Sequence, residues 1–92
     1  MPSAHHPLFR SVGRRIAELR SASALTQEGL AARLKVSLRY VQRMEAGEEN
    51  LSLVSLDRIA KVFRAPVSAL FEAPHTSKPR AGRPRGSTRS GR

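Results

Sequence analysis

Apolar side chains recur along the chain at intervals of three and four residues, the spacing that gathers them on one face of an α-helix. Five segments show this pattern, at 8–22, 27–34, 37–46, 53–64 and 66–71. The side chains predicted to face inward are Phe9, Val12, Ile16, Leu19, Leu30, Ala31, Leu34, Val41, Met44, Leu53, Leu56, Ile59, Ala60, Phe63, Val67, Leu70 and Phe71. Neither strand alternation nor an internal repeat is visible. The sequence therefore predicts an all-α fold of five short helices.

Residue types at the ends of these segments support the prediction. Thr26, Ser37 and Ser52 each precede an apolar stripe, where a side-chain oxygen can accept a hydrogen bond from a free backbone N–H of the next turn. Gly47 follows the third segment and suits the left-handed conformation that ends many helices.

The same pattern divides the chain into three parts. Residues 1–7 hold two prolines and no apolar periodicity, so we expect a flexible arm. Residues 8–73 form the predicted helical domain. From residue 74 onward Pro, Gly, Ser and Arg dominate without any large apolar side chain, which predicts a disordered tail over 74–92.

Charge and composition narrow the function. The 92 residues contain 17 Lys and Arg against 7 Asp and Glu, a formal net charge of +10, and no acid follows Glu72. Such a balance favours a polyanionic partner. The absence of cysteine excludes disulfides and thiolate metal sites. Neither a membrane-spanning run nor a signal-peptide pattern is present, so we expect a cytoplasmic protein without a membrane partner.

Catalytic and metal-binding chemistry is not indicated. Asp57 is the only aspartate, and the three histidines lie in the predicted flexible flanks. His5 and His6 are adjacent but have no third ligand converging on them. We therefore expect no metal, no cofactor and no enzymatic activity.

The second and third predicted helices are separated by very few residues. Only Lys35 and Val36 lie between the end of one and the cap of the next. This spacing is typical of a helix-turn-helix, in which the first helix braces the second against the major groove of DNA. Spacing alone is weak support, because any small helical bundle contains similar turns.

A longer run of motifs carries a family resemblance. The matching segments, in order, are 14–20 (RRIAELR), 25–28 (LTQE), 30–34 (LAARL), 36–37 (VS), 40–41 (YV), 45–47 (EAG), 51–53 (LSL), 59–61 (IAK) and 66–71 (PVSALF). Residues 13–71 thereby resemble the lambda-repressor-like (XRE-type) helix-turn-helix family, which includes phage repressors, restriction–modification controller proteins and antitoxins. The short chain and the segment 50–53 look most like the controller proteins.

The resemblance implies roles for individual positions. Leu38, Arg39, Gln42 and Arg43 occupy the base-reading positions of the third helix. An arginine fork can hydrogen-bond guanine O6 and N7 together, glutamine can pair with adenine, and leucine can touch a thymine methyl.

Other matched positions concern the DNA backbone and the architecture. Gln27 is expected to bind a phosphate, with Lys35 and Tyr40 as further backbone contacts. Arg20 and Glu45 match a family pair that forms a structural salt bridge between the first and third helices.

The chain also departs from the family. Ala24, Lys35 and Arg64 stand at turn positions that are usually glycine. If these turns keep a positive φ, each costs about 1 kcal/mol relative to glycine. Glu48 and Glu49 follow the reading helix where many relatives carry bases, and they would repel DNA unless they point away.

The basic tail suggests a second mode of DNA contact. The core Gly82-Arg83-Pro84, flanked by Arg80 and Arg85, looks like an AT-hook, an extended peptide that lies in narrow A·T minor grooves. Ala81 departs from that motif, which normally has arginine there. The alternative is a tail that binds phosphates without sequence preference.

We therefore expect a sequence-specific transcriptional regulator that binds double-stranded DNA at the nucleoid as a symmetric homodimer. The predicted dimer contacts are Val54, Phe63, Val67 and Leu70. Two alternatives remain. One is an antitoxin-type protein that sequesters a protein partner and regulates its own operon. The other is an architectural DNA-binding protein in which the tail dominates.

Overall fold

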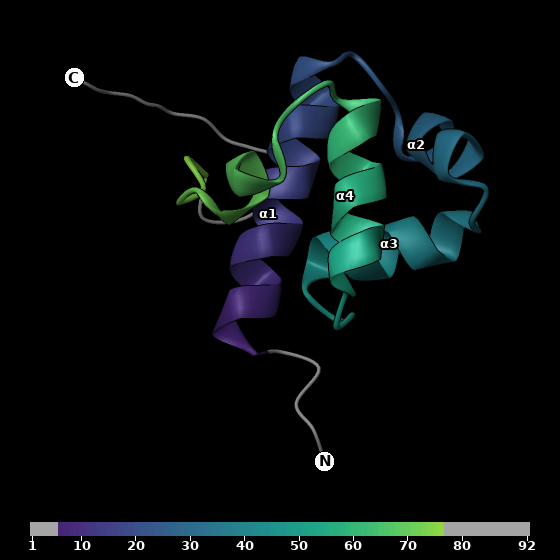
Figure 1. Cartoon of the computed structure of the whole chain (residues 1–92). Coiled ribbons are helices and arrows are strands. Elements are labelled where there is room, and N and C mark those ends of the chain that lie inside the picture. The colour runs from purple at the N-terminus through teal and green to yellow at the C-terminus, as the bar shows by residue number, and fades with distance from the viewer. Residues whose placement is uncertain (1–5, 77–92) are drawn as a thin grey trace, which may run out of the picture.

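The computed structural model of the chain describes residues 6–76, which form four α-helices and one short 3₁₀ helix (Figure 1). Their order is α1 (Pro7–Ala22), α2 (Gln27–Leu34), α3 (Leu38–Ala46), α4 (Leu53–Val62) and η1 (Val67–Phe71). No strand occurs in these residues, which confirms the predicted all-α class.

The long helix α1 is the element around which the others are arranged. It packs against α3 and against η1, while α2 contacts both α3 and α4, and α4 contacts η1. Figure 1 shows α2 and α3 together on one side of α1, η1 on the other side, and α4 running between these two groups.

One hydrophobic core joins all five elements. Its largest fully buried side chains are Ile16, Leu30, Val41, Met44, Ile59 and Leu70, which come from α1, α2, α3, α4 and η1. All six belong to the faces predicted to point inward. Because each element supplies at least one of them, the position of α3 depends on the whole core.

The predicted helix ends are confirmed. The side-chain oxygens of Thr26, Ser37 and Ser52 each accept a hydrogen bond from the backbone N–H three residues later, at 2.9–3.0 Å. Gly47 closes α3 with φ of 79°. These caps satisfy backbone groups that a helix end leaves unpaired.

The three turns without the usual glycine keep the left-handed backbone. Ala24, Lys35 and Arg64 have φ values of 58°, 61° and 56°. The expected strain of about 1 kcal/mol relative to glycine therefore applies at each of them.

The fifth element differs from the prediction. Residues 67–71 form a 3₁₀ helix, not an α-helix. In a 3₁₀ helix the side chains at i and i+3 eclipse, whereas i+4 is rotated away. Leu70 is accordingly fully buried, but Phe71, predicted to face inward, is 47% exposed. Leu53, also predicted inward, opens α4 at the edge of the core and is 75% exposed.

Ordered contacts extend past both predicted bounds of the helical domain. The Nδ1 atom of His6 accepts a hydrogen bond from the Leu8 N–H at 3.0 Å, and Pro7 is the first residue of α1. At the other end, Thr76 donates from its backbone N–H and its hydroxyl to Glu18 Oε2, at 2.6 and 2.8 Å. Residues 6–7 and Thr76 therefore make defined contacts with α1 or within it.

Candidate nucleic-acid interface

Helices α2 and α3 are joined by a three-residue turn whose conformation is fixed locally. Lys35 adopts the left-handed conformation, and the Val36 N–H donates to the Ala31 carbonyl at 3.0 Å. Arg58, on α4, donates to the Leu34 carbonyl at 2.7 Å. The carbonyls of Ala31 and Leu34 thus have partners, and α3 leaves the turn in a defined direction.

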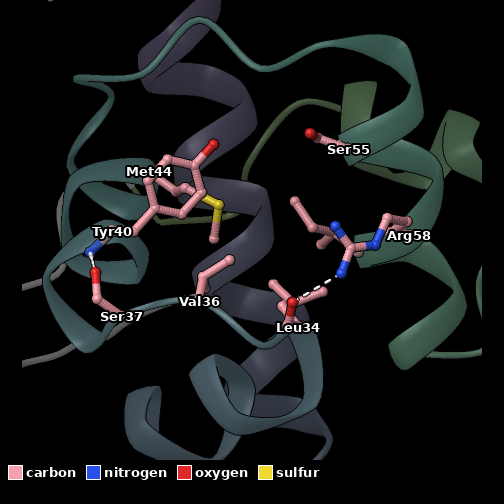
Figure 2. A pocket seen from close by; sticks show the side chains of 8 residues that line it. Leu34, Val36, Ser37, Tyr40, Met44, Ser55 and Arg58 are labelled. Carbon is pink, nitrogen blue, oxygen red and sulfur yellow. Dashed lines mark hydrogen bonds between the residues drawn. The ribbon is translucent and has the colours of Figure 1, made fainter.

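A pocket of about 350 Å³ lies behind this turn. Figure 2 shows Tyr40 and Met44 of α3 on one side, Ser55 and Arg58 of α4 on the other, and Val36 near the turn. Sequence reasoning did not single out Arg58, because nothing local signals a bond between residues 24 positions apart. Arg58 links α4 to the end of α2, and so supports the turn.

The second helix of the pair, α3, has one buried and one exposed face. Val41, Met44 and Glu45 are buried. On the opposite face Arg39 and Gln42 are exposed, whereas Leu38 and Arg43 are partly buried. The four predicted base-reading residues therefore lie on the side away from the core, with unequal accessibility.

Arg43 differs from Arg39 in having acidic partners. Its Nε donates to Glu49 Oε2 at 2.7 Å, and its Nη1 lies 3.7 Å from Glu48 Oε1. The hydrogen bond and the charge of Glu49 raise the pKa of Arg43 above its ordinary value. No hydrogen bond or ion pair joins Arg39 to any residue within 6–76. The two acids thus turn toward Arg43.

The position of α3 is fixed by an ion pair to α1. Arg20 Nε lies 2.6 Å from Glu45 Oε2, and Arg20 Nη2 donates to Oε1 at 3.2 Å. Arg20 Nη1 also donates to the Leu25 carbonyl at 2.8 Å. Both side chains of the ion pair are largely buried. Removing one partner of a buried pair typically costs about 3–5 kcal/mol, so this bridge holds the two helices together.

Gln27 belongs to the same network. Its Nε2 donates to Glu45 Oε1 at 2.9 Å. An amide nitrogen carries two hydrogens, so the second donor is left over from this contact. The residue predicted to bind a phosphate is thus held at the start of α2 by the ion pair.

The other two residues predicted to contact the DNA backbone lie in the turn and in the first turn of α3. Lys35 is exposed at the turn, and Tyr40 is partly buried beside the pocket. Burial and the nearby charge of Glu49 raise the pKa of Tyr40 above its ordinary value of 10.0.

The four predicted dimer contacts do not form one surface. Val54 is 70% exposed, Phe63 and Val67 pack partly against the core, and Leu70 is fully buried. Leu70 is therefore a core residue with no surface to offer a partner. The large apolar side chains that are exposed within residues 6–76 are Leu8, Leu53, Val54 and Phe71. Three of them, Leu8, Leu53 and Phe71, line one groove.

Comparison with known proteins assigns the family. Residues 11–72 match the family model of the helix-turn-helix domain. The chain belongs to the helix-turn-helix family. An uncharacterized transcriptional regulator in the ATPase CF(0) region of Rhodospirillum rubrum is 35% identical over 75 residues, which are 82% of this chain and 69% of that protein. The resemblance seen in the sequence is thereby confirmed, and the chain is a member of a family of DNA-binding transcriptional regulators.

Solved structures agree with this assignment. The restriction-modification controller protein C.AhdI from Aeromonas hydrophila has a TM-score of 0.65 and 35% identity, over 68% of this chain and 96% of that chain. The clp gene regulator ClgR from Corynebacterium glutamicum has a TM-score of 0.67 and 23% identity, over 72% and 70% of the two chains. At that identity ClgR supports the fold alone.

Several sequence predictions fall outside the structural description. The AT-hook-like residues Arg80, Gly82, Arg83, Pro84 and Arg85, together with His5, lie outside residues 6–76. Within that range no three His, Asp or Glu side chains gather as metal ligands. None of the helices described is long and apolar enough to cross a membrane.

Proposed function

We propose that the protein is a sequence-specific transcriptional regulator that reads the major groove with α3 as a symmetric dimer. The observation that carries this proposal is the outer face of α3. Arg39 and Gln42 are exposed there, while the opposite face is locked into the core and tied to α1 by the Arg20–Glu45 bridge. A rigid helix with exposed hydrogen-bonding side chains is what base readout requires.

The proposed contacts with the DNA backbone follow from the same orientation of α3. Gln27 lies at the start of α2 and Lys35 in the turn, so both flank the reading helix. Contacts to phosphate fix the register of a protein on DNA, whereas contacts to base edges specify the sequence. We assign Gln27, Lys35 and Tyr40 to the first role. The second role falls to Leu38, Arg39, Gln42 and Arg43.

Dimerisation is the second part of the proposal. A single domain reads only a short half-site, and two-fold dimers of this class read half-sites about one helical turn apart. The exposed Leu8, Leu53 and Phe71 form an apolar surface that is suited to a second copy of the chain. We assign the dimer contact to these residues and Val54, in place of Phe63 and Val67, which pack partly against the core, and of Leu70, which is buried. Such a regulator would act on the DNA of the nucleoid, in the cytoplasm.

The proposal is tested by selecting binders from a random duplex DNA library. The full chain and a fragment of residues 1–76, which keeps the Thr76–Glu18 contact, are used in parallel. We expect both to enrich the same two-fold-symmetric motif containing guanine. If only the full chain binds, with nothing beyond an A·T preference, the basic tail is the DNA-binding element and the proposal is wrong.

A further inference from the structure

The loop that follows α3 places two carboxylates beside the proposed reading face. Glu49 Oε2 accepts from Arg43 Nε at 2.7 Å. Glu48 contributes its Oε1, 3.7 Å from Arg43 Nη1, and its backbone carbonyl, which accepts from Nη2 at 3.4 Å. All three nitrogens of this guanidinium therefore face the loop.

Arg39 provides the contrast on the same helix. It lies four residues earlier, one turn along the outer face, and it is exposed. Among residues 6–76 it has no hydrogen-bonding or ion-pair partner. Of the two arginines assigned to base readout, Arg39 is available to contact DNA, whereas Arg43 already has hydrogen-bond acceptors within its own chain.

The two acids also set the charge of this face. Glu48 and Glu49 balance the charges of Arg39 and Arg43. Binding of DNA without regard to sequence depends on cations that neutralise phosphates. A guanidinium held by a carboxylate contributes little to that binding, because the acid cancels its charge locally. The loop acids therefore reduce the attraction of α3 to any DNA.

We propose that Glu49 is a specificity-determining residue that withholds Arg43 from phosphates and yields it only to a guanine. The proposal rests on the reading role of α3 proposed above. A guanine offers two acceptors, O6 and N7, in the geometry of the guanidinium fork, and such a bidentate pair discriminates against the wrong base by about 5- to 150-fold. A phosphate can accept from the same fork, but Glu49 already gives Arg43 an anionic partner, so exchanging one anion for another gains little. Arg43 therefore leaves the loop at the correct sequence and stays with it elsewhere.

The test is a double-mutant cycle on the full chain. The variants are Glu49→Gln, Arg43→Gln and the two combined. Two probes are used: a duplex of random sequence, and the duplex that the full chain selects from a random library. Affinity for each is measured over a salt series. Circular dichroism and thermal melting check that every variant is folded.

We expect Glu49→Gln to release Arg43 onto phosphates. Its affinity for the random duplex should rise about threefold, a size typical of one exposed ion pair. The slope of log affinity against log salt should steepen by about one unit, as for one additional phosphate contact. Affinity for the selected duplex should change less, so the ratio between the two falls. In the Arg43→Gln background, Glu49→Gln removes only the repulsion of its own charge, so it should raise the affinity for both probes by the same factor and leave their ratio unchanged.

One result would overturn the inference while leaving the proposed function intact. If Glu49→Gln lowers the ratio of affinities for the selected and random duplexes equally in the Arg43→Gln background, the acid sets specificity without acting through Arg43. Failure of the proposed function gives a different result. In that case neither Arg39→Gln nor Arg43→Gln weakens binding to the selected duplex, whatever Glu49→Gln does.

A matched control separates the effect of the loop carboxylate Glu49 from the effect of the overall net charge. Asp57 and Lys61 form an exposed ion pair of 2.8 Å on α4. Asp57→Asn therefore removes one acid and frees one cation, as Glu49→Gln does, but on α4 and without a contact to Arg43. We expect the ratio of the affinities for the selected and random duplexes to be the same in Asp57→Asn as in the unmodified protein. An equal fall in Asp57→Asn would show that overall charge sets the ratio, and would overturn the inference.

Tyr40 provides an independent check in the absence of DNA. It is the only tyrosine of the chain, and tryptophan is absent, so the absorbance of tyrosinate reports this residue alone. Burial and Glu49 together raise the pKa of Tyr40. Glu49→Gln should lower it toward the ordinary value of 10.0. An unchanged titration would place Glu49 away from α3 in solution and would contradict the inference.

Discussion

At the scale of single residues, Gly13 decides how closely α1 approaches α3. A Cβ atom built on Gly13 would lie 2.3 Å from the Met44 carbonyl oxygen and 2.9 Å from that of Glu45. Both are backbone atoms, so they cannot move aside as a flexible side chain can. The missing side chain therefore permits the contact that positions the reading helix.

We predict that Gly13→Ala destabilises the protein. The clash would force α1 and α3 apart, and overpacking of this kind costs about 1–3 kcal/mol. Urea unfolding measures the change. Gly29→Ala is the matched control, because its Cβ would meet side-chain atoms at 3.3 Å and alanine favours the helix. The control should stay within about 1 kcal/mol of the unmodified protein. Equal stability of the two variants would show that the close approach is absent.

Local features of this kind were predictable from sequence where they depend on neighbouring residues. The caps at Thr26, Ser37 and Ser52 and the left-handed Gly47 follow from residue type and position within a few residues. The close approach at Gly13 and the contact of Arg43 with Glu49 were not predicted. Both depend on which backbone or side chain comes near in three dimensions, and the sequence pattern does not encode that.

At the scale of elements, η1 and the residues after it are tied to α1 by polar contacts. Arg15 is buried, and its Nε donates to the Ala69 carbonyl at 2.9 Å. Its other nitrogens contact Glu18 and Glu72 at 3.0 and 3.2 Å. Thr76 then donates to Glu18 on the same helix. These contacts explain why the domain continues to residue 76 although its apolar pattern ends at Phe71.

This region also shows the limit of a periodicity argument. Residues 67–71 have apolar side chains at i, i+3 and i+4, and this spacing predicts one turn of α-helix. So short a segment is decided by the contacts at its ends and not by its own pattern. Leu70 would face the core in either an α-helix or a 3₁₀ helix. Phe71 would face the core only in an α-helix, and it is exposed here.

We predict that Glu18 contributes an acid-sensitive part of the stability. Burial raises the pKa of the Glu18 carboxyl, but the hydrogen bonds from Thr76 and Arg15 outweigh it, so the pKa lies below the ordinary 4.5. A lowered pKa stabilises the fold above the unfolded value, and this stabilisation is lost as the pH falls through the folded value. Glu18→Gln should therefore lower the melting temperature at neutral pH and flatten its fall below about pH 4.5.

The control for this prediction is Glu28→Gln, an exposed glutamate on α2. Its melting temperature should follow that of the unmodified protein across the same pH range. If Glu18→Gln and the unmodified protein lose stability in parallel below pH 4.5, the Thr76–Glu18 contact does not contribute to folding.

At the scale of the whole molecule, the apolar surface is concentrated at the groove near the start of α4. Leu53 is 75% exposed and borders a groove with Leu8 and Phe71. An exposed apolar cluster is costly in water unless a partner covers it. The sequence predicts a dimer with Leu70 among its contacts, but Leu70 is buried in the core. Apolar periodicity identifies the inward face of a helix and does not separate core residues from interface residues on that face.

We predict that Leu53→Lys separates the dimer without unfolding the domain, since the side chain is exposed in the single chain. Sedimentation at tens of micromolar should show dimer for the unmodified protein and monomer for the variant. Leu53→Met, which keeps the apolar surface, should remain dimeric. A monomeric unmodified protein, with or without the selected duplex, would contradict the dimer proposal.

The most direct test of the account concerns Arg39, the exposed arginine of α3 that has no partner within residues 6–76. Binders are selected from a random duplex library with the unmodified chain and with Arg39→Gln, and the two motifs are compared base by base. If α3 reads the major groove of a symmetric site, the variant should keep the symmetry and the spacing but lose the guanine preference at one position of each half-site. An identical motif from both proteins would show that Arg39 reads no base, and would contradict the assignment of α3 as the reading helix.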